Sequence, residues 1–247
     1  MTMGQSVLRV AMWSGPRNIS TALMRAWGNR ADTTVCDEPL YAHYLKVTGR
    51  AHRGADEVIA AGPTQWSDVI DWVLGPVPDG KRIFYQKHMT HHLLPELDRG
   101  WMRGLANCFL IRSPREVIGS LIQHVPDATL ADTGFAQQAE IFHLVRSWTG
   151  QIPPVIDARD VLNNPRAVIG KLCERLGVEF TDRMLSWPPG LRETDGVWAK
   201  YWYKEVETTT SFQPYQPKPD RVPPNLDSLV AACEEYYQQL YPHRLTA

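Results

Sequence analysis

The stretch LRVAMWSGPRNISTAL, residues 8–23, decides the fold. Its first half is a short, mostly apolar run that is typical of a buried strand. The turn SGPRN follows at residues 14–18, and residues 20–29 have helical composition. A loop that joins a buried strand to a helix presents unpaired backbone N–H groups and the positive end of the helix dipole. The stretch therefore predicts an α/β fold with an anion site after the first strand.

Small and donor-bearing residues fill this loop. Hydroxyl groups and a planar guanidinium are good donors to a phosphate or sulfate oxygen. The alternative is an N-capped helix whose Ser and Thr side chains serve only its own backbone. The loop is not a Walker A motif, since it lacks that motif's second glycine and its lysine. The candidate anion-binding residues are Ser14, Gly15, Pro16, Arg17, Asn18, Ile19, Ser20 and Thr21.

Short apolar runs continue to alternate with longer helical segments along the chain. We expect strands at residues 8–13, 33–36, 83–86, 107–111 and 155–157, and helices at 68–74, 114–122, 135–149, 163–176 and 226–240. This order predicts an α/β protein with three α/β/α layers around a central parallel sheet of about five strands. We expect one domain over residues 1–247, with residues 185–247 forming an irregular and helical C-terminal extension packed on it.

The composition excludes several function classes. Lys and Arg total 26 while Asp and Glu total 27, so the net charge is −1 and no general nucleic-acid partner is expected. We see neither a signal-like N-terminus nor a long uninterrupted apolar run, and so we expect a cytoplasmic protein without a membrane span. The four scattered cysteines are expected to be reduced and buried.

A second motif, FLIRSPREVIGS at residues 109–120, pairs with the loop. It is a strand ending in Arg112, followed by a helix that carries Ser120 two turns along. An arginine and a serine so placed could hold one phosphate between them. This second motif favours an anion site over a simple helix cap at residues 14–21.

Together these motifs resemble those of the sulfotransferases that use 3′-phosphoadenosine 5′-phosphosulfate (PAPS). Arg112, Pro114 and Ser120 match the R-x-P-x-x-x-x-x-S segment that holds the adenosine 3′-phosphate in that family. RNISTAL, residues 17–23, is similar to the family's phosphosulfate loop, except that Ile19 stands where the family has glycine. CDEPL at 36–40 and QKH at 86–88 are similar to two further family elements.

The resemblance covers about residues 8–190 and implies a P-loop NTPase-like sulfotransferase fold. It implies PAPS as co-substrate and adenosine 3′,5′-bisphosphate as product, without a required metal. It also implies a small-molecule acceptor with a hydroxyl or amine, and it leaves a homodimer open as the oligomeric state. Arg17, Ser20 and Lys87 are the candidates for stabilising the charge on the transferring group. Glu38 is the first candidate for the general base and His88 the second, and the sequence does not separate them.

Other readings stay open at this stage. Because Ile19 replaces the family's glycine, a second hypothesis stays open: a nucleotide-binding protein that does not transfer a sulfuryl group. A P-loop phosphotransferase is disfavoured because the Walker A lysine is missing. The run of His88, His91 and His92 lacks a carboxylate beside it in the sequence, so we expect no metal site there. Trp198, Trp202 and Tyr203 either cover a ligand or pack the C-terminal extension onto the sheet.

Overall fold

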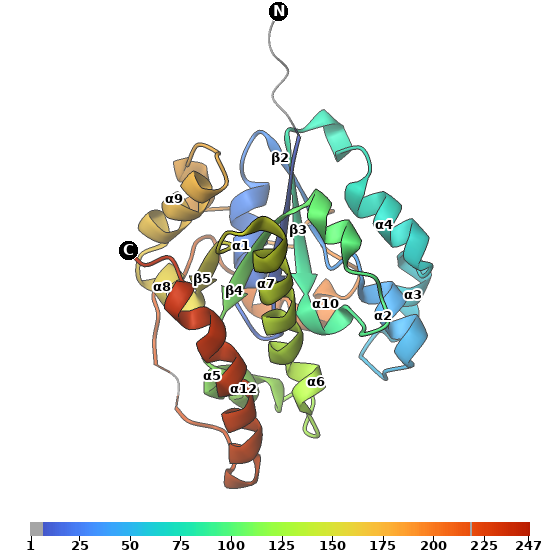
Figure 1. Ribbon diagram of the computed structural model, residues 1–247, viewed down its shortest axis with the longest axis vertical. Coiled ribbons are helices and arrows are strands. Elements are labelled where there is room, and N and C mark those ends of the chain that lie inside the picture. The colour runs from blue at the N-terminus through green and yellow to red at the C-terminus, as the bar shows by residue number, and fades with distance from the viewer. Residues whose placement is uncertain (1–6, 218) are drawn as a thin grey trace, which may run out of the picture.

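The structure is a computed structural model that describes residues 7–217 and 219–247. Five parallel strands form its sheet in the order β2-β3-β1-β4-β5 (Figure 1). Their bounds are β1 Leu8–Ser14, β2 Thr33–Asp37, β3 Ile83–Met89, β4 Ala106–Ile111 and β5 Val155–Asp157. Every strand expected from the sequence is present, and the predicted α/β fold with a parallel sheet is confirmed.

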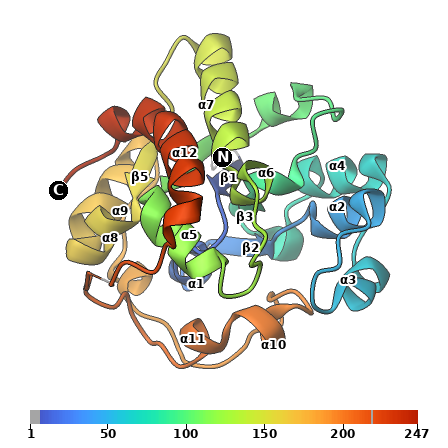
Figure 2. The ribbon, with the colours of Figure 1, turned by 90° about the horizontal axis from the view of Figure 1, so that it is seen from below.

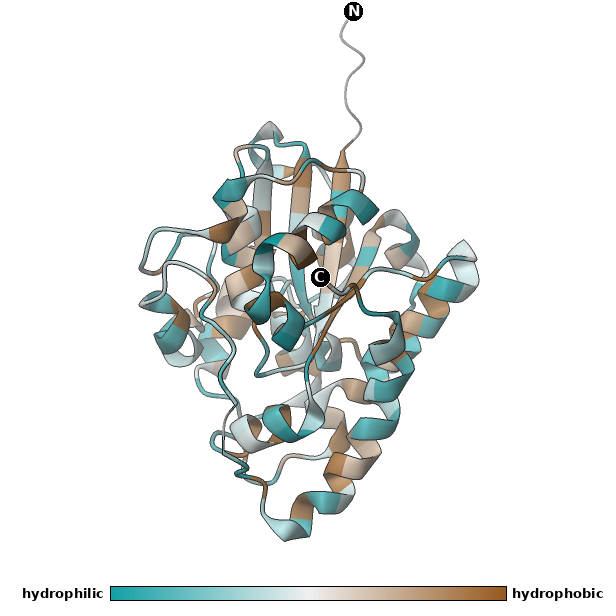
Figure 3. Cartoon of the chain, turned by 90° about the vertical axis from the view of Figure 1, so that its left-hand side faces the viewer, coloured by the Kyte–Doolittle hydropathy of each residue, from teal (hydrophilic) through white to brown (hydrophobic). Residues whose placement is uncertain are grey.

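Both faces of the sheet are covered, which is why the strands are so apolar (Figure 3). The helices have these bounds: α1 Ser20–Gly28, α2 Tyr41–Thr48, α3 Ala55–Ala61, α4 Trp66–Leu74, α5 Pro114–Leu121, α6 Leu130–Thr133, α7 Phe135–Thr149, α8 Ala158–Asn163, α9 Pro165–Arg175, α10 Ala199–Trp202, α11 Lys204–Glu207 and α12 Asp227–Leu240. Val10 and Met12 pack on one face with residues of α1, α8 and α9, whereas Ala11 and Trp13 pack on the other with residues of α4, α5, α7 and α12. Short 3-10 segments cover Pro78–Gly80, Thr90–His92, Gly100–Gly104, Asp182–Leu185, Pro224–Leu226 and Tyr241–His243.

The longer helices agree with the prediction, and the differences have local causes. The helix expected at 163–176 is present as α9, which begins at Pro165 because Asn164 caps it through its side-chain oxygen, 3.2 Å from the Ala167 nitrogen. The sequence analysis missed α2, α3 and α8, the last of which ends at Asn163. Five consecutive residues of α2, 41–45, are buried, so its pattern carries no helical period.

The topology creates a ligand-binding position at the carboxyl ends of the central strands. From β1 the chain crosses to β2 on one side, and β4 lies on the other side of β1. Such a reversal in strand order leaves a crevice in which open α/β sheets bind ligands. Helices α10 and α11 of the C-terminal extension lie at the margin opposite α7 and α12 (Figure 2). Within the residues that the structure describes, no helix has both the length and the apolar character needed to cross a bilayer.

Candidate active site

The loop after β1 follows a tightly constrained path. A Cβ atom on Gly15 would lie 2.7 Å from the carbonyl oxygen of Thr133, so only glycine fits there. Ser14 is fully buried, with its hydroxyl 3.9 Å from the sulfur of Met89, and Pro16 is half-buried. Arg17 has a φ of 55°, in the left-handed region that residues other than glycine rarely adopt. Strain of this kind is concentrated at functional sites.

Asn18 attaches the loop to β4 and to the start of α1. Its amide nitrogen donates to the Leu110 carbonyl oxygen at 3.3 Å, and its side-chain oxygen accepts from the Ile19 N–H at 2.8 Å. Ile19 is the N-cap residue and provides no side-chain acceptor, so the capping alternative finds no support at this position. Its φ of −88° suits a β-branched residue, and the conformation therefore does not demand glycine there. Buried Ser20 and half-buried Thr21 form the first turn of α1, where helix N–H groups lack helical partners.

The structure brings the two sequence motifs together. The Arg17 Nε atom donates to the Ser120 hydroxyl at 2.9 Å, across 103 residues of sequence. Arg112 donates to the Arg17 carbonyl oxygen at 2.9 Å and forms an ion pair with Glu116 at 2.8 Å. Burial lowers the pKa of the Arg17 guanidinium from its ordinary value. Two guanidinium groups and a hydroxyl thus belong to one connected arrangement at the carboxyl edge of the sheet.

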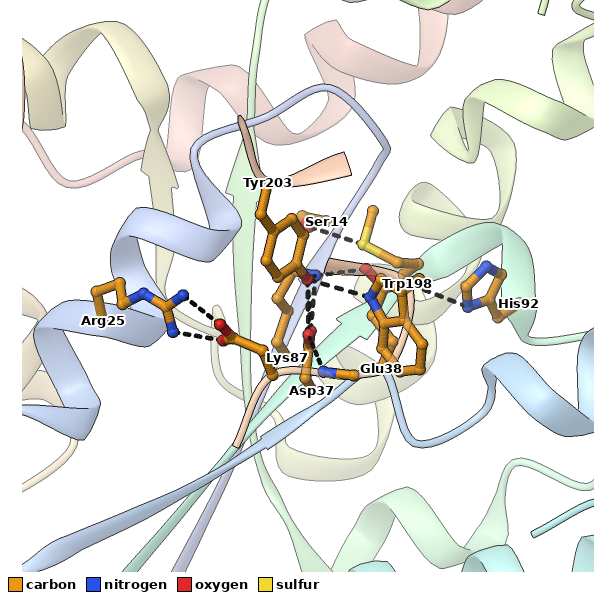
Figure 4. Close-up of polar contacts among 11 residues, drawn as sticks. Ser14, Arg25, Asp37, Glu38, Lys87, His92, Trp198 and Tyr203 are labelled. Carbon is orange, nitrogen blue, oxygen red and sulfur yellow. Dashed lines mark hydrogen bonds and ion pairs between the residues drawn. The ribbon is translucent and has the colours of Figure 1, made fainter. Parts of the chain in front are cut away.

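A buried ion cluster lies between β2 and β3 and is centred on Lys87 (Figure 4). The ammonium group pairs with Asp37 at 2.9 Å and with Glu38, and it also contacts the Tyr203 hydroxyl at 2.8 Å. The side chains of Lys87 and Asp37 are 2% and 1% exposed. Burial alone would lower the pKa of Lys87, but the two carboxylates overcome it and raise that pKa well above its ordinary value.

Glu38 is held at the end of β2 by its own backbone. Its N–H donates to the Lys87 carbonyl oxygen at 2.9 Å, and its carbonyl oxygen accepts from the Tyr41 N–H at 3.0 Å. Its φ of 44° again falls in the left-handed region. Burial raises the pKa of the Glu38 carboxyl above its ordinary value, against the opposing charge of Lys87. Such a carboxylate can accept a proton more readily than one in water.

The sulfotransferase domain family model matches residues 8–243, nearly the whole chain. The chain belongs to the sulfotransferase domain family. Two Arabidopsis thaliana proteins named branched-chain-amino-acid aminotransferase-like protein 1 and 2 are 33% and 31% identical to it, over 94% of this chain and 41% of their own lengths. The chain thus spans about two fifths of these relatives.

Solved sulfotransferase structures share its fold. The sulfotransferase domain from the curacin biosynthetic pathway aligns at a TM-score of 0.50 and 15% identity, over 98% of this chain and 99% of that one. The sulfotransferase from Alicyclobacillus acidocaldarius aligns at a TM-score of 0.51 and 12% identity, over 95% and 96%. At these identities the likeness concerns the fold alone.

In this sulfotransferase domain His88 lies away from the ion cluster. Successive side chains of a strand point to opposite faces, so His88 and Lys87 lie on different sides of the sheet. The His88 ring stacks on Trp13, with centroids 4.4 Å apart, and its Nε2 atom lies 3.0 Å from the Gln86 side-chain oxygen. Burial lowers the pKa of His88 to about 3. The structure therefore does not bring the second candidate base together with the others.

The C-terminal extension closes over the cluster of the sulfotransferase domain. Tyr203 donates to Asp37 at 2.7 Å, and the Trp198 indole nitrogen donates to the Tyr203 hydroxyl at 3.3 Å. Asp195 forms a two-pronged ion pair with Arg25 of α1, and these side chains are 2% and 1% exposed. Trp198 and Tyr203 thus pack the extension onto the sheet and at the same time cover the ion cluster.

Loss of the Arg25 partner is expected to be costly. In Asp195→Ala the guanidinium of Arg25 would stay buried without its carboxylate, which destabilises proteins by about 3–5 kcal/mol. Urea unfolding followed by tryptophan fluorescence measures this loss. The control is Asp182→Ala, which breaks the exposed pair with Arg166 and should leave the midpoint nearly unchanged. Equal midpoints for the two variants would contradict the argument.

A small pocket of about 120 Å³ opens beside Arg112. Glu116, Arg159 and Tyr215 also line it, and the Tyr215 hydroxyl donates to Glu116 at 2.6 Å. The Arg159 guanidinium lies 4.7 Å from the centre of the Tyr215 ring. Arg112 therefore adjoins open space that carries further cationic and aromatic groups.

Sequence reasoning missed several residues of the site. Asp37 precedes Glu38 directly, and this adjacent pair of acids was a signal that could have found it. Asp195 carried no local signal, because a long loop brings it to Arg25 from a distant position. His92 belongs to the histidine run noted in the sequence, but its spacing did not show that its Nδ1 atom lies 3.9 Å from Oε2 of Glu38. Among the described residues, no group of three or more His, Cys, Asp or Glu side chains is arranged to hold a metal ion.

Proposed function

We propose that this protein transfers the sulfuryl group of PAPS to a hydroxyl or amine of a small-molecule acceptor. The observation that carries the proposal is the hydrogen bond from Arg17 to Ser120, together with the bond from Arg112 to the Arg17 carbonyl oxygen. These contacts join the two sequence motifs that resemble the phosphosulfate and 3′-phosphate elements of PAPS-dependent enzymes. Family membership supports the transfer reaction, and the joined motifs support this donor.

The donor would lie along the carboxyl edge of the sheet. The first turn of α1 and the Arg17 guanidinium would hold the 5′-phosphosulfate, where N–H groups and positive charge stabilise the leaving phosphate. Arg112 and Ser120 would hold the 3′-phosphate. Arg112 now forms an ion pair with Glu116. To hold the phosphate as well, its guanidinium would have to be shared between Glu116 and the phosphate.

Glu38 would act as the general base. It lies at the end of β2 beside Lys87, and burial raises its pKa. During transfer the acceptor oxygen or nitrogen forms a bond to sulfur while the bond from sulfur to the 5′-phosphate oxygen breaks. The acceptor proton would pass to Glu38, and Lys87 would stabilise negative charge on the transferring group. His88 has no part in this scheme because it lies on the opposite face of the sheet.

The first experiment measures thermal unfolding with adenosine 3′,5′-bisphosphate, with 5′-AMP, and with ATP plus Mg²⁺. A ligand present at 100 times its dissociation constant stabilises the native state by about 2.7 kcal/mol. We expect this stabilisation with the bisphosphate and its loss in Arg112→Ala. Arg115→Ala, three residues further along in the first turn of α5 and paired with exposed Asp220 and Asp227, is the matched control and should retain it.

The outcomes separate three functions. Bisphosphate-specific stabilisation that depends on Arg112, followed by product release from PAPS in a screen of acceptors, supports the proposal. The same stabilisation without transfer to any acceptor indicates a nucleotide-binding protein. Greater stabilisation by ATP plus Mg²⁺ indicates a phosphotransferase and overturns the assignment of the donor.

A further inference from the structure

The C-terminal extension supplies hydrogen-bond donors to the buried ion cluster in addition to covering it. The Gly196 N–H donates to Oδ2 of Asp37 at 3.2 Å, and the Tyr203 hydroxyl donates to the same oxygen at 2.7 Å (Figure 4). These contacts join residues that lie 159 and 166 positions apart in the sequence. The Trp198 indole N–H donates in turn to the Tyr203 oxygen at 3.3 Å. The charge distribution within the cluster therefore depends on the extension.

The direction of each hydrogen bond at the Tyr203 hydroxyl is fixed. Burial, together with the charge of Asp37, raises the pKa of Tyr203 well above its ordinary value, so the hydroxyl keeps its proton. That proton is donated to Asp37, and the oxygen accepts from the Lys87 ammonium group at 2.8 Å and from Trp198. A hydroxyl has one donor and two acceptor lone pairs. All three are used, so this hydroxyl holds its partners in place and is not free to bind substrate.

Tyr203 is also the third partner of the Lys87 ammonium group. The other two partners are Oδ1 of Asp37 at 2.9 Å and Oε1 of Glu38. An ammonium group has three N–H donors, so Lys87 has one for each of these partners. Its position between the two carboxylates is therefore fixed on three sides. In the proposed reaction it would act on the transferring group through its charge and not through a free N–H.

The two carboxylates of the cluster differ in what they accept. Asp37, with a side chain that is 1% exposed, accepts from Lys87 and from two groups of the extension. Glu38, with a side chain that is 11% exposed, contacts Lys87 through Oε1. Its Oε2 atom lies 3.9 Å from Nδ1 of His92, which is beyond hydrogen-bond distance. Asp37 is thus the saturated counter-ion of Lys87, and Oε2 of Glu38 is the oxygen left to take a proton.

We propose that Tyr203 is a positioning residue for sulfuryl transfer: its hydroxyl secures Asp37 and Lys87, so that Lys87 stays shared between the two carboxylates while Glu38 accepts the proton. This inference rests on the proposed transferase function. Without the hydroxyl, Asp37 would lose a donor and would draw Lys87 more strongly. Less positive charge would then offset the burial of Glu38, and the pKa of Glu38 would rise further.

The other groups around Glu38 leave its titration readable. The titratable and charged groups that face it are Asp37 of β2, Lys87 of β3, Tyr41 of α2, His92 of the 3-10 segment and Tyr203 of the extension. The pKa values of Lys87, Tyr41 and Tyr203 are raised, and burial lowers the pKa of His92 well below its ordinary value. Near neutral pH the lysine therefore stays charged, and the two tyrosines and the histidine stay neutral.

The kinetic test uses Tyr203→Phe with the most active acceptor from the screen. Phenylalanine keeps the ring, whose centre lies 5.2 Å from the Lys87 nitrogen, and removes only the hydroxyl. We expect the acidic limb of kcat/KM to move to higher pH. On that limb the rate should fall about tenfold, the usual effect of removing one hydrogen bond to a charged group. Well above the limb it should approach the wild-type rate, because Glu38 is ionised in both proteins.

The matched control is Tyr201→Phe, which removes a hydroxyl that donates to Glu57 at 2.7 Å, on the surface and outside the cluster. Its pH profile should match that of the wild type. Stabilisation by adenosine 3′,5′-bisphosphate should persist in both variants, because the contacts of Arg17 with Ser120 and Arg112 are untouched. A wild-type pH profile in Tyr203→Phe overturns the inference. So does an equal loss of rate at every pH, which is what a merely structural role would produce.

A second measurement does not depend on turnover. Carbon NMR of protein with isotope-labelled glutamate carboxyl groups follows Glu38 without interference from Asp37, and the Glu38 resonance is assigned by its absence in Glu38→Gln. We expect this resonance to titrate at higher pH in Tyr203→Phe than in the wild type or in Tyr201→Phe. A wild-type protein that releases no bisphosphate from PAPS contradicts the proposed function. An unshifted titration of Glu38 in Tyr203→Phe contradicts the role of Tyr203, whichever result the kinetics give.

Discussion

Replacement of Lys87 by methionine is expected to lower the free energy of unfolding by about 3–5 kcal/mol, because it leaves the buried carboxylates of Asp37 and Glu38 without their cation. The pKa of Lys87 is raised in the folded protein, so its contribution to stability is complete below the ordinary lysine pKa and is lost only at strongly alkaline pH. Urea unfolding at pH 7 therefore measures the full effect.

Two further variants make the result for Lys87 interpretable. Lys46→Met removes an exposed lysine of α2 and should leave the unfolding midpoint nearly unchanged. The double variant Lys87→Met with Glu38→Gln should recover part of the lost stability, since only one carboxylate then remains unpaired. If Lys87→Met unfolds at the same urea concentration as Lys46→Met, the ion cluster does not stabilise the fold.

Replacement of Glu38 by glutamine is expected to lower kcat by about 100- to 10,000-fold, the usual contribution of a general base. Glutamine retains the size of the side chain, and the contacts of Arg17 with Ser120 and Arg112 are untouched. Stabilisation by adenosine 3′,5′-bisphosphate should therefore persist. In the wild type, kcat/KM should rise with pH as Glu38 ionises, around a midpoint above its ordinary pKa, because burial raises that value.

The pH profile of Glu38→Gln serves as the internal check. The acidic limb assigned to Glu38 should disappear, leaving a low rate that no longer rises over the same range. Near wild-type kcat in this variant would show that another group takes the acceptor proton. Loss of bisphosphate binding would show instead that glutamine disturbs the loop after β1.

The local pattern of apolar residues predicted the fold well, because each strand of a parallel sheet covered on both faces is a short apolar run in the sequence. Residues 14–21 and Arg112 to Ser120 were also recognisable, since a strand, a turn and a helix carry them in a fixed order. The meeting of Arg17 with Ser120 followed from topology, because β1 and β4 are neighbours whose carboxyl ends lie at one edge.

The remaining parts of the site depend on contacts that sequence spacing does not encode. Tyr203 contacts Asp37, and Asp195 contacts Arg25, each across more than 150 residues of sequence. Tyr203 and Asp195 lie in the C-terminal extension, whose sequence shows no regular hydrophobic period around them. Which of the two candidate bases lies beside Lys87 depended on the faces of the sheet that the side chains of Glu38 and His88 meet. The position of His92 beside Glu38 depended on a 3-10 turn after the strand, and histidine spacing alone does not indicate such a turn.

The left-handed backbone at Arg17 has a consequence for any attempt to improve this protein in the laboratory. A residue other than glycine in such a conformation costs roughly 1–3 kcal/mol, so glycine at this position would relieve strain. The same change at Glu38 would also remove a buried partner of Lys87, and the loss of that ion pair outweighs the strain relieved. Selection for heat resistance alone would therefore favour loss of the Arg17 guanidinium, and directed evolution of this scaffold needs an activity screen at every round.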